Sequence, residues 1–215
     1  MKDPEPVEGP TYIKFKLQNY SFLHYDSGIY KNFPIFGQKN DLTMNELELF
    51  SKITTIVFDY DGVMTDGTVF SDPNGQPWRA TNVKDGYALQ LDTTLGYTVA
   101  VISGAICPSM EVRMTSLGVS DVFTGVPNKV LKLKEYMNRK GLSPEEIIFM
   151  GDDIPDLMVM KEVGLPACPA DAVPEIKEIC KFVSDRPGGK GAVRDVVEHM
   201  LKAQGKWMTE EAYAW

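Results

Sequence analysis

The chain has 215 residues, of which 43% are hydrophobic, and carries a formal net charge of -8. This length can bury a sizeable core and indicates one domain with an appendage rather than two full domains. The acidic balance argues against nucleic acid or an anionic membrane as the main partner, although a local basic pocket would still accept a small anion.

Residues 1–43 differ from the rest of the chain. They are rich in aromatic residues and Asn but show neither the period of a helix nor that of a strand. Two interpretations of this N-terminal extension remain: an arm that packs on this or another subunit, and non-native upstream translation with the true start at Met44. We favour the second, because the sequence from Met44 onward is an ordinary beginning for the domain that follows.

From residue 53 onward, short apolar runs alternate with helical patterns. The runs predict strands at residues 53–58, 97–103, 121–125, 146–150, 165–170 and 182–184. Helices with Pro starts or Gly ends are predicted at residues 85–96, 108–118, 128–141 and 191–205. Repeated strand-helix units predict an α/β fold with a doubly wound parallel sheet. We place this domain at residues 44–208 and treat 209–215 as a C-terminal tail.

One segment interrupts this alternation directly after the first strand. In residues 68–83, "TVFSDPNGQPWRATNV", two short strand-like pieces flank "DPNGQP", whose Pro, Asn and Gly are typical of a hairpin turn. We therefore expect a projecting β-hairpin here. Asp66, at the root of this hairpin, is interpreted as a turn residue.

Two aspartates stand at the carboxyl end of the first predicted strand, where open α/β sheets bind ligands. Asp59 and Asp61 are two residues apart, so their side chains point roughly the same way if the chain stays extended. Carboxylates this close repel each other unless a cation or a shared proton intervenes. A ligand set made only of oxygen atoms favours Mg²⁺.

The same edge of the sheet collects further polar residues. Ser103 follows the second long strand, Lys129 opens a helix, and "GDDIPD" places Asp152, Asp153 and Asp156 after a later strand. Taken singly, Asp153 and Asp156 are better interpreted as turn or helix-cap residues, Ser103 as a turn residue and Lys129 as a solvated lysine. The order of the DxDG and GDD clusters, Ser103 and Lys129 at neighbouring strand ends instead indicates a site for a metal and a phosphoryl group, while Asp156 keeps the turn or cap interpretation.

This order of motifs resembles that of the haloacid dehalogenase-like phosphatases. "DYDGVMTDG", "ISG", Lys129 and "GDDIPD" match the four motifs of that superfamily. The longer stretches "NVKDGYALQL", "EVRMTSLGV", "GGKGAVRDVV" and "LKAQGKW" are similar to the 3-deoxy-D-manno-octulosonate 8-phosphate phosphatase family. The resemblance covers about residues 50–208. It implies a capless enzyme of lipopolysaccharide biosynthesis.

The resemblance also implies catalytic roles. Asp59 would attack phosphorus and form an aspartyl-phosphate, and Asp61 would act first as general acid and then as general base. Mg²⁺ would be held by Asp59, the backbone carbonyl of Asp61, and Asp152. Ser103 and Lys129 would bind the phosphoryl oxygens.

By the same resemblance, one segment and an arginine line the substrate site, and Asp153 supports the metal site. The expected substrate-binding residues are Asn82, Val83, Lys84, Asp85, Gly86 and Arg113. Members of the family form homotetramers in which the hairpin packs between subunits and helps to close the neighbouring active site. The expected partner is a small phosphorylated sugar acid.

Two departures leave the sugar acid open. Ala105 and Gln90 stand where the family typically has arginines, which removes two bidentate partners for a substrate carboxylate. The first candidate is 3-deoxy-D-manno-octulosonate 8-phosphate, and the second is a nonulosonate 9-phosphate of the sialic acid or deaminated type.

Two further alternatives are not phosphatases. A phosphorylatable receiver domain fits less well, because there the acidic pair comes first and the phosphoacceptor lies on a later strand. A noncatalytic assembly module of the same fold would not need Asp59, Asp61, Lys129 and Asp152 together.

The sequence also bears on where the protein works. No apolar run approaches the roughly 18 residues of a membrane span, and the start of the chain lacks the pattern of a signal peptide. Three widely spaced cysteines fit reduced thiols. We therefore expect a cytoplasmic protein.

Overall fold

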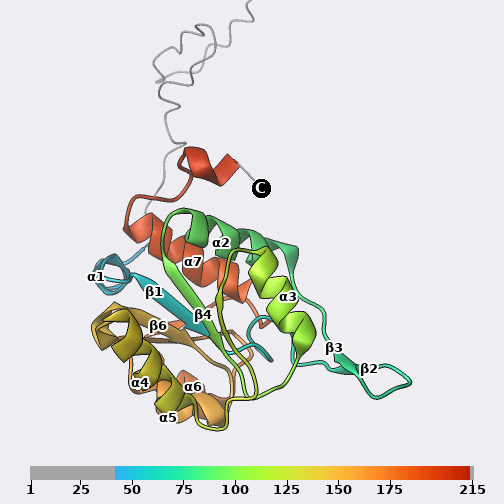
Figure 1. Ribbon diagram of the computed structural model, residues 1–215. Helices are drawn as coiled ribbons and strands as arrows, with labels where there is room; N and C mark the ends of the chain where they lie inside the picture. Colours follow the sequence, from blue (N-terminus) through green and yellow to red (C-terminus); the bar gives the residue numbers. More distant parts are fainter. Residues whose placement is uncertain (1–41, 214–215) are drawn as a thin grey trace, which may run out of the picture. The chain divides into compact units, whose positions relative to one another are not determined.

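The computed structural model describes residues 42–213, and its centre is a six-stranded sheet (Figure 1). The strand order is β5-β4-β1-β6-β7-β8, and every pair is parallel. The strands are β1 (Thr55–Phe58), β4 (Thr98–Ile102), β5 (Asp121–Phe123), β6 (Ile147–Met150), β7 (Leu165–Cys168) and β8 (Phe182–Val183). All six predicted strands are confirmed, with ends that differ by a few residues.

Helices cover both faces of this sheet. One face packs against α1 (Met44–Ser51), α2 (Val83–Thr94), α3 (Pro108–Ser116) and α7 (Ala192–Ala203). The other packs against α4 (Lys129–Lys140), α5 (Leu157–Met160) and α6 (Pro174–Lys177). Three short 3₁₀ helices complete the described chain: η1 (Pro144–Glu146), η2 (Ile154–Asp156) and η3 (Glu210–Tyr213). The sequence patterns missed α1, α5 and α6, because helices of eight or four residues are too short to show a clear helical period.

Each central strand contributes to two separate cores. In β1, Ile56 and Phe58 pack toward α2 and α7, while Val57 between them packs toward α4 and α5. β6 divides its residues in the same way. This division follows from the two-residue period of a strand, and it explains why these strands are apolar throughout. The predicted doubly wound α/β fold is confirmed.

The described chain begins just before α1. Thr43 caps this helix: its hydroxyl accepts from Glu46 N at 3.2 Å, and Glu46 accepts from Thr43 N at 2.7 Å. Leu42 is buried. The ordered cap therefore lies one residue before the predicted boundary at Met44. Residues 1–41 of the expected extension lie outside the described residues. Among those described, no helix has the length and apolar character that crossing a membrane requires.

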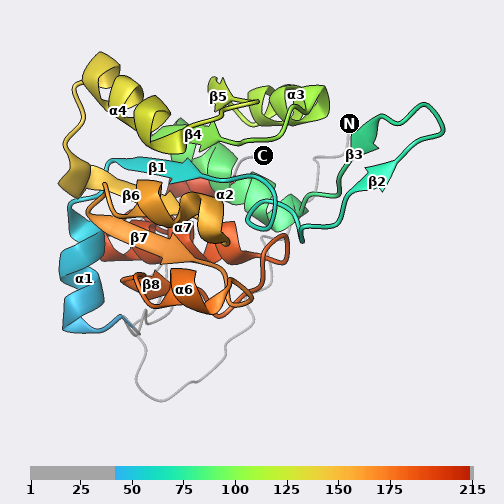
Figure 2. The same ribbon diagram turned by 90° about the horizontal axis from the view of Figure 1, so that it is seen from below.

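The hairpin predicted after the first strand is present. β2 (Phe70–Ser71) pairs antiparallel with β3 (Pro77–Trp78), and the pair projects away from the sheet in Figures 1 and 2. Asp72 shapes its turn by accepting from Asn74 N and Gln76 N, both at 2.8 Å. At the root, Asp66 accepts from Thr68 N at 3.1 Å, which confirms that it is a turn residue.

One buried group in α2 opposes folding. Asp92 is fully buried, and neither of its carboxylate oxygens has a hydrogen-bond partner among residues 42–213. Burial raises the pKa of Asp92 well above its usual value, against a smaller opposing effect of Lys206. The folded chain therefore binds this proton more tightly than the unfolded chain, so the stability falls as pH rises above the unfolded pKa of about 4.

We expect Asp92→Asn to raise the melting temperature, and to do so more at pH 8 than at pH 5. Asn has nearly the shape of the protonated acid but cannot ionise, so the variant avoids the cost of either keeping the proton or burying the charge. The expected gain in the free energy of unfolding is about 1 kcal/mol or more, and each kcal/mol raises the melting temperature by roughly 2–4 °C. Thermal unfolding at both pH values measures it, with the exposed Asp185→Asn as control. A pH-independent difference would contradict this account.

Candidate active site

Asp59 lies at the carboxyl end of β1, where the backbone fixes its position. Its amide donates to Met150 O of β6 at 2.9 Å, so the two strands hold the residue between them. Its Oδ1 accepts from Tyr60 N at 2.7 Å. The side chain is almost fully buried but faces Lys129 and two other carboxylates.

Lys129 joins two of these carboxylates. It is the first residue of α4, directly after the N-cap Asn128, whose side chain accepts from Leu131 N at 3.0 Å. Lys129 Nζ lies 3.0 Å from Asp59 Oδ1 and 2.6 Å from Asp156 Oδ1. Burial alone would lower the pKa of Lys129, but Asp59 and Asp156 raise it, so the ammonium stays charged.

Asp156 is the residue that the sequence interpretation placed wrongly. Its side chain makes no capping hydrogen bond within the described chain. Instead it is 1% exposed, binds Lys129 through Oδ1 and accepts from Asp152 N through Oδ2 at 3.3 Å. The cap interpretation holds for Asp153, which accepts from Ile154 N at 2.7 Å. The four-residue spacing between Asp152 and Asp156 was the feature of the sequence that could have indicated their hydrogen bond.

Three carboxylates form a candidate metal site. Oxygen atoms of Asp59, Asp152 and Asp156 all lie within 4.8 Å of one another. Burial, followed by the charge of Asp156, raises the pKa of Asp59 to about 7, and burial with the charge of Asp59 raises the pKa of Asp152 to about 7. The three carboxylates together therefore favour binding of a proton or a cation, and their oxygen atoms suit a hard cation such as Mg²⁺.

Gly62, the glycine after Asp61, lets the Asp152 carboxylate lie close to the backbone of this loop. Gly62 has φ +81°, and a Cβ atom there would lie 2.0 Å from Asp152 Oδ2. Any other residue would both strain the backbone and displace Asp152.

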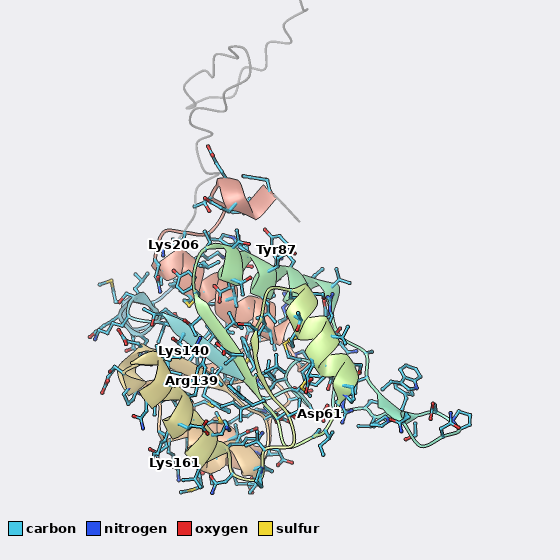
Figure 3. All side chains as sticks on the ribbon, viewed as in Figure 1. Asp61, Tyr87, Arg139, Lys140, Lys161 and Lys206 are labelled. Atoms are coloured by element: carbon cyan, nitrogen blue, oxygen red, sulfur yellow. The ribbon has the colours of Figure 1, made fainter. Side chains whose placement is uncertain are left out.

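Asp61 differs from Asp59 in its surroundings. Figure 3 shows it between the ends of the central strands and the root of the hairpin. Arg79, directly after β3, binds it through both oxygens: Nε to Oδ1 at 2.5 Å and Nη2 to Oδ2 at 2.9 Å. The hydrogen bond to Asp61 is the main cause that raises the pKa of Arg79. The Asp61 carboxylate thus lies apart from the acidic group, and a metal contact through its backbone carbonyl stays a prediction.

Ser103 lies at the neighbouring strand end, after β4. It is 2% exposed, and its hydroxyl accepts from Ala105 N at 3.2 Å. Its carbonyl accepts from Val126 N at 3.0 Å, which joins this loop to the segment leading to Lys129. The structure brings Ser103 to the predicted edge of the sheet, and its contact with a phosphoryl group stays a prediction.

The first three predicted substrate residues form the start of α2. Asn82 is the N-cap: its Oδ1 accepts from Lys84 N at 2.8 Å, and its Nδ2 donates to Gly189 O at 3.3 Å. Val83 and Lys84 are exposed, so both side chains are accessible to a ligand.

The next two residues have packing roles. Asp85 is fully buried and accepts from Gly191 N at 3.2 Å and Arg194 N at 2.8 Å. Gly191, the N-cap of α7, has no side chain to do this, so Asp85 caps α7 from α2. Its carboxylate is buried, and its contact with substrate stays a prediction. At Gly86, a Cβ atom would lie 2.5 Å from Arg113 Nη2, so this glycine makes room for the arginine.

Comparison with known proteins agrees with this geometry. A family model described as haloacid dehalogenase-like hydrolase matches residues 99–195. The 3-deoxy-D-manno-octulosonate 8-phosphate phosphatase of Escherichia coli (strain K12) is 36% identical over 154 residues, which are 72% of this chain and 82% of that protein.

Two crystal structures of such phosphatases are also similar. The Yersinia pestis enzyme has a TM-score of 0.75 and 33% identity over 77% of this chain and 89% of that one. The Moraxella catarrhalis enzyme, in complex with a magnesium ion, a phosphate ion and a KDO molecule, has a TM-score of 0.74 and 29% identity over 77% and 95%. The chain is therefore a phosphatase of the haloacid dehalogenase-like hydrolases and belongs to the 3-deoxy-D-manno-octulosonate 8-phosphate phosphatase family.

Proposed function

We propose that this enzyme uses Mg²⁺ to hydrolyse a phosphorylated sugar acid, with 3-deoxy-D-manno-octulosonate 8-phosphate as its first candidate substrate. The observation that carries the proposal is the contact of Lys129 with Asp59 and Asp156 beside Asp152, at the end of the central strands. The names of the relatives and the ligands of the Moraxella catarrhalis structure support the choice of metal and substrate. A cytoplasmic location agrees with this proposal and stays a prediction.

In the proposed reaction, an Asp59 oxygen attacks phosphorus and the bond to the sugar oxygen breaks. Asp61 gives its proton to the leaving alkoxide and then takes a proton from the water that hydrolyses the aspartyl-phosphate. Lys129 neutralises phosphoryl oxygens, and Ser103 donates to them. Asp59 and Asp152 would hold Mg²⁺, which would supply further positive charge for these oxygens.

Arg79 gives this scheme a link to the sugar acid. It binds both oxygens of Asp61, so Asp61 has to leave Arg79 before it reaches a leaving group. Arg79 Nη1 is buried without a hydrogen-bond partner in the described part of the chain. A substrate carboxylate would satisfy Nη1, compete for the guanidinium and free Asp61. Arg79 would thus replace part of the positive charge missing at Ala105 and Gln90.

A nonulosonate 9-phosphate remains the second candidate, because Ala105 removes a bulky side chain beside Ser103 and leaves room for a longer sugar acid. A noncatalytic assembly module is disfavoured, since the buried Lys129 group is costly to keep unless it is used.

Asp59→Asn should reduce Mg²⁺-dependent hydrolysis of p-nitrophenyl phosphate by roughly a thousandfold or more, because the nucleophile is lost. Steady-state rates with and without Mg²⁺ measure this. The matched control is Asp66→Asn at the root of the hairpin, which should keep its activity. Turnover without a divalent cation, or an active Asp59→Asn, would rule out the mechanism.

Arg79→Ala should lower kcat/KM for octulosonate 8-phosphate and nonulosonate 9-phosphates by roughly 10- to 100-fold more than for p-nitrophenyl phosphate, which has no carboxylate. Hydrogen bonds to charged groups contribute about 1.5–3 kcal/mol, which sets this range. Arg139→Ala, at an exposed arginine of α4, is the control (Figure 3).

The same substrate panel, extended to hexose phosphates, tests the substrate class with the unmodified enzyme. A wide preference for hexose phosphates would contradict the assignment to sugar acids.

We also propose that the enzyme is a homotetramer in which the hairpin packs between subunits. Phe70 and Trp78 are 44% and 51% exposed, and their rings stack with centroids 4.5 Å apart. Exposed aromatic side chains of this kind are common in interfaces between proteins.

The double variant Phe70→Ser with Trp78→Ser should therefore lower the mass in solution, measured by light scattering after size exclusion, from roughly four times the 24.0 kDa chain. The control is Leu131→Ser, at an exposed position of α4. A monomeric unmodified protein, or an unchanged mass of the double variant, would contradict the proposed interface.

A further inference from the structure

Two loops to which no catalytic residue has been assigned meet beside the active site. One joins β7 to α6 at residues 169–173, and the other joins β8 to α7 at residues 184–191. The side chain of Asp171, in the first loop, accepts through Oδ1 from Gly188 N of the second loop at 2.9 Å. Asp171 therefore joins the two loops.

The loop before α7 lies on the segment that follows Asp61. Gly189 N donates to Val63 O at 2.9 Å, and a Cβ atom at Gly188 would lie 1.8 Å from Gly62 O. Two glycines thus allow backbone to pack directly on backbone here, and Gly189 has φ +62°, which favours glycine. The position of the segment after Asp61 therefore depends on where this loop lies.

The loop after β7 holds the other acidic segment of the site. Val173 N, two residues after Asp171, donates to the carbonyl of Asp152 at 3.0 Å. The Asp152 carboxylate lies against Gly62, so the contacts form a closed ring from the candidate metal ligand through both loops to the residue after Asp61. Asp171 joins the two loops through a side chain, whereas the hydrogen bonds from the loops to the two acidic segments are made by backbone atoms.

We propose that Asp171 is a positioning residue for the phosphatase reaction: its hydrogen bond to Gly188 fixes the position of the Asp61 loop relative to Asp152. The inference rests on the roles proposed above for Asp61 as general acid and for Asp152 as a Mg²⁺ ligand. Asp171 acts through these two residues rather than on the substrate. Without its carboxylate, Gly188 N loses this acceptor, and the loop before α7 can move together with the segment packed on it.

The structure also indicates what remains when Asp171 is replaced. The two loops keep the hydrogen bond from Ala170 N to Arg186 O at 2.9 Å, so we expect the variant to fold with the loops displaced rather than detached. A displacement of about 1 Å at a catalytic group can lower a rate by roughly a hundredfold. Asp171 is exposed, and water and salt screen its charge, so its hydrogen bond is the larger contribution.

The first test compares Asp171→Ala with the unmodified enzyme on p-nitrophenyl phosphate and on phenyl phosphate. Phenolate is the more basic leaving group, so its departure depends more on the proton from Asp61. We expect kcat to fall roughly tenfold or more on p-nitrophenyl phosphate and further on phenyl phosphate, with KM changed less than about threefold. The matched control is Asp185→Ala, at an exposed position of the loop before α7, which should keep both rates.

The second measurement is Mg²⁺ binding by isothermal titration calorimetry in the absence of substrate. Displacement of Asp152 in Asp171→Ala should weaken this binding by roughly tenfold. Asp171→Asn keeps an oxygen that can accept from Gly188 N, so it should restore both the rates and the affinity. Asp171→Glu keeps the charge but moves the oxygen by one methylene group, so it should stay impaired.

Unchanged rates and Mg²⁺ affinity in Asp171→Ala would overturn the inference. An equal loss on both substrates with unchanged Mg²⁺ affinity would assign the loss to general destabilisation and overturn it as well. If circular dichroism shows that Asp171→Ala is unfolded, the other two variants decide, because a positioning role requires Asn to be the more active and a role of the charge requires Glu. Turnover of the unmodified enzyme without Mg²⁺ would instead contradict the proposed function, and the inference with it.

Discussion

The position of the Lys129 ammonium is the contact on which the active site depends. Three carboxylates at the end of one sheet would repel each other, and burial increases the cost of each charge by several kcal/mol. Lys129 contacts Asp59 and Asp156 directly, and no ion pair to Asp152 is found among residues 42–213, so negative charge is in excess there. Burial raises the pKa values of Asp59 and Asp152, and the charges of the neighbouring carboxylates raise them further. A divalent cation would remove it, so the same arrangement that is costly without a metal becomes a metal site.

The scaffold brings these groups together through strand register. Phe58 of β1 pairs with Met150 of β6, so the residues that follow, Asp59 and the loop to Asp152, leave the sheet at the same level. Gly62 lets the two loops approach more closely than any side chain would permit. The sheet thus sets the positions of Asp59 and Asp152, and Gly62 sets how closely their two loops approach.

The sequence predicted those features whose signals are local. Strands, the hairpin and the order of Asp59, Ser103 and Lys129 follow from apolar runs, turn residues and the rule that ligands lie at strand ends. Asp156 was missed because an aspartate after a strand and before a helix has the pattern of a cap. The capping role of Asp85 could not be predicted, because no local signal reveals that α7, far along the chain, lacks a capping side chain; a contact of Asp85 with substrate stays a prediction. Contacts between distant segments decide both cases.

The pair of Arg79 and Asp61 connects the chemistry to the projecting hairpin. Arg79 follows β3 directly, so its position relative to Asp61 depends on where the hairpin lies. The hairpin has two strands only, and such a unit is marginally stable until something packs against it. Its exposed Phe70 and Trp78 offer the surface for that packing. Any contact that fixes the hairpin also fixes Arg79. Through Arg79 it fixes Asp61, the residue proposed to protonate the leaving sugar oxygen. In this arrangement, the proposed assembly and the proposed acid catalysis would depend on the same short segment.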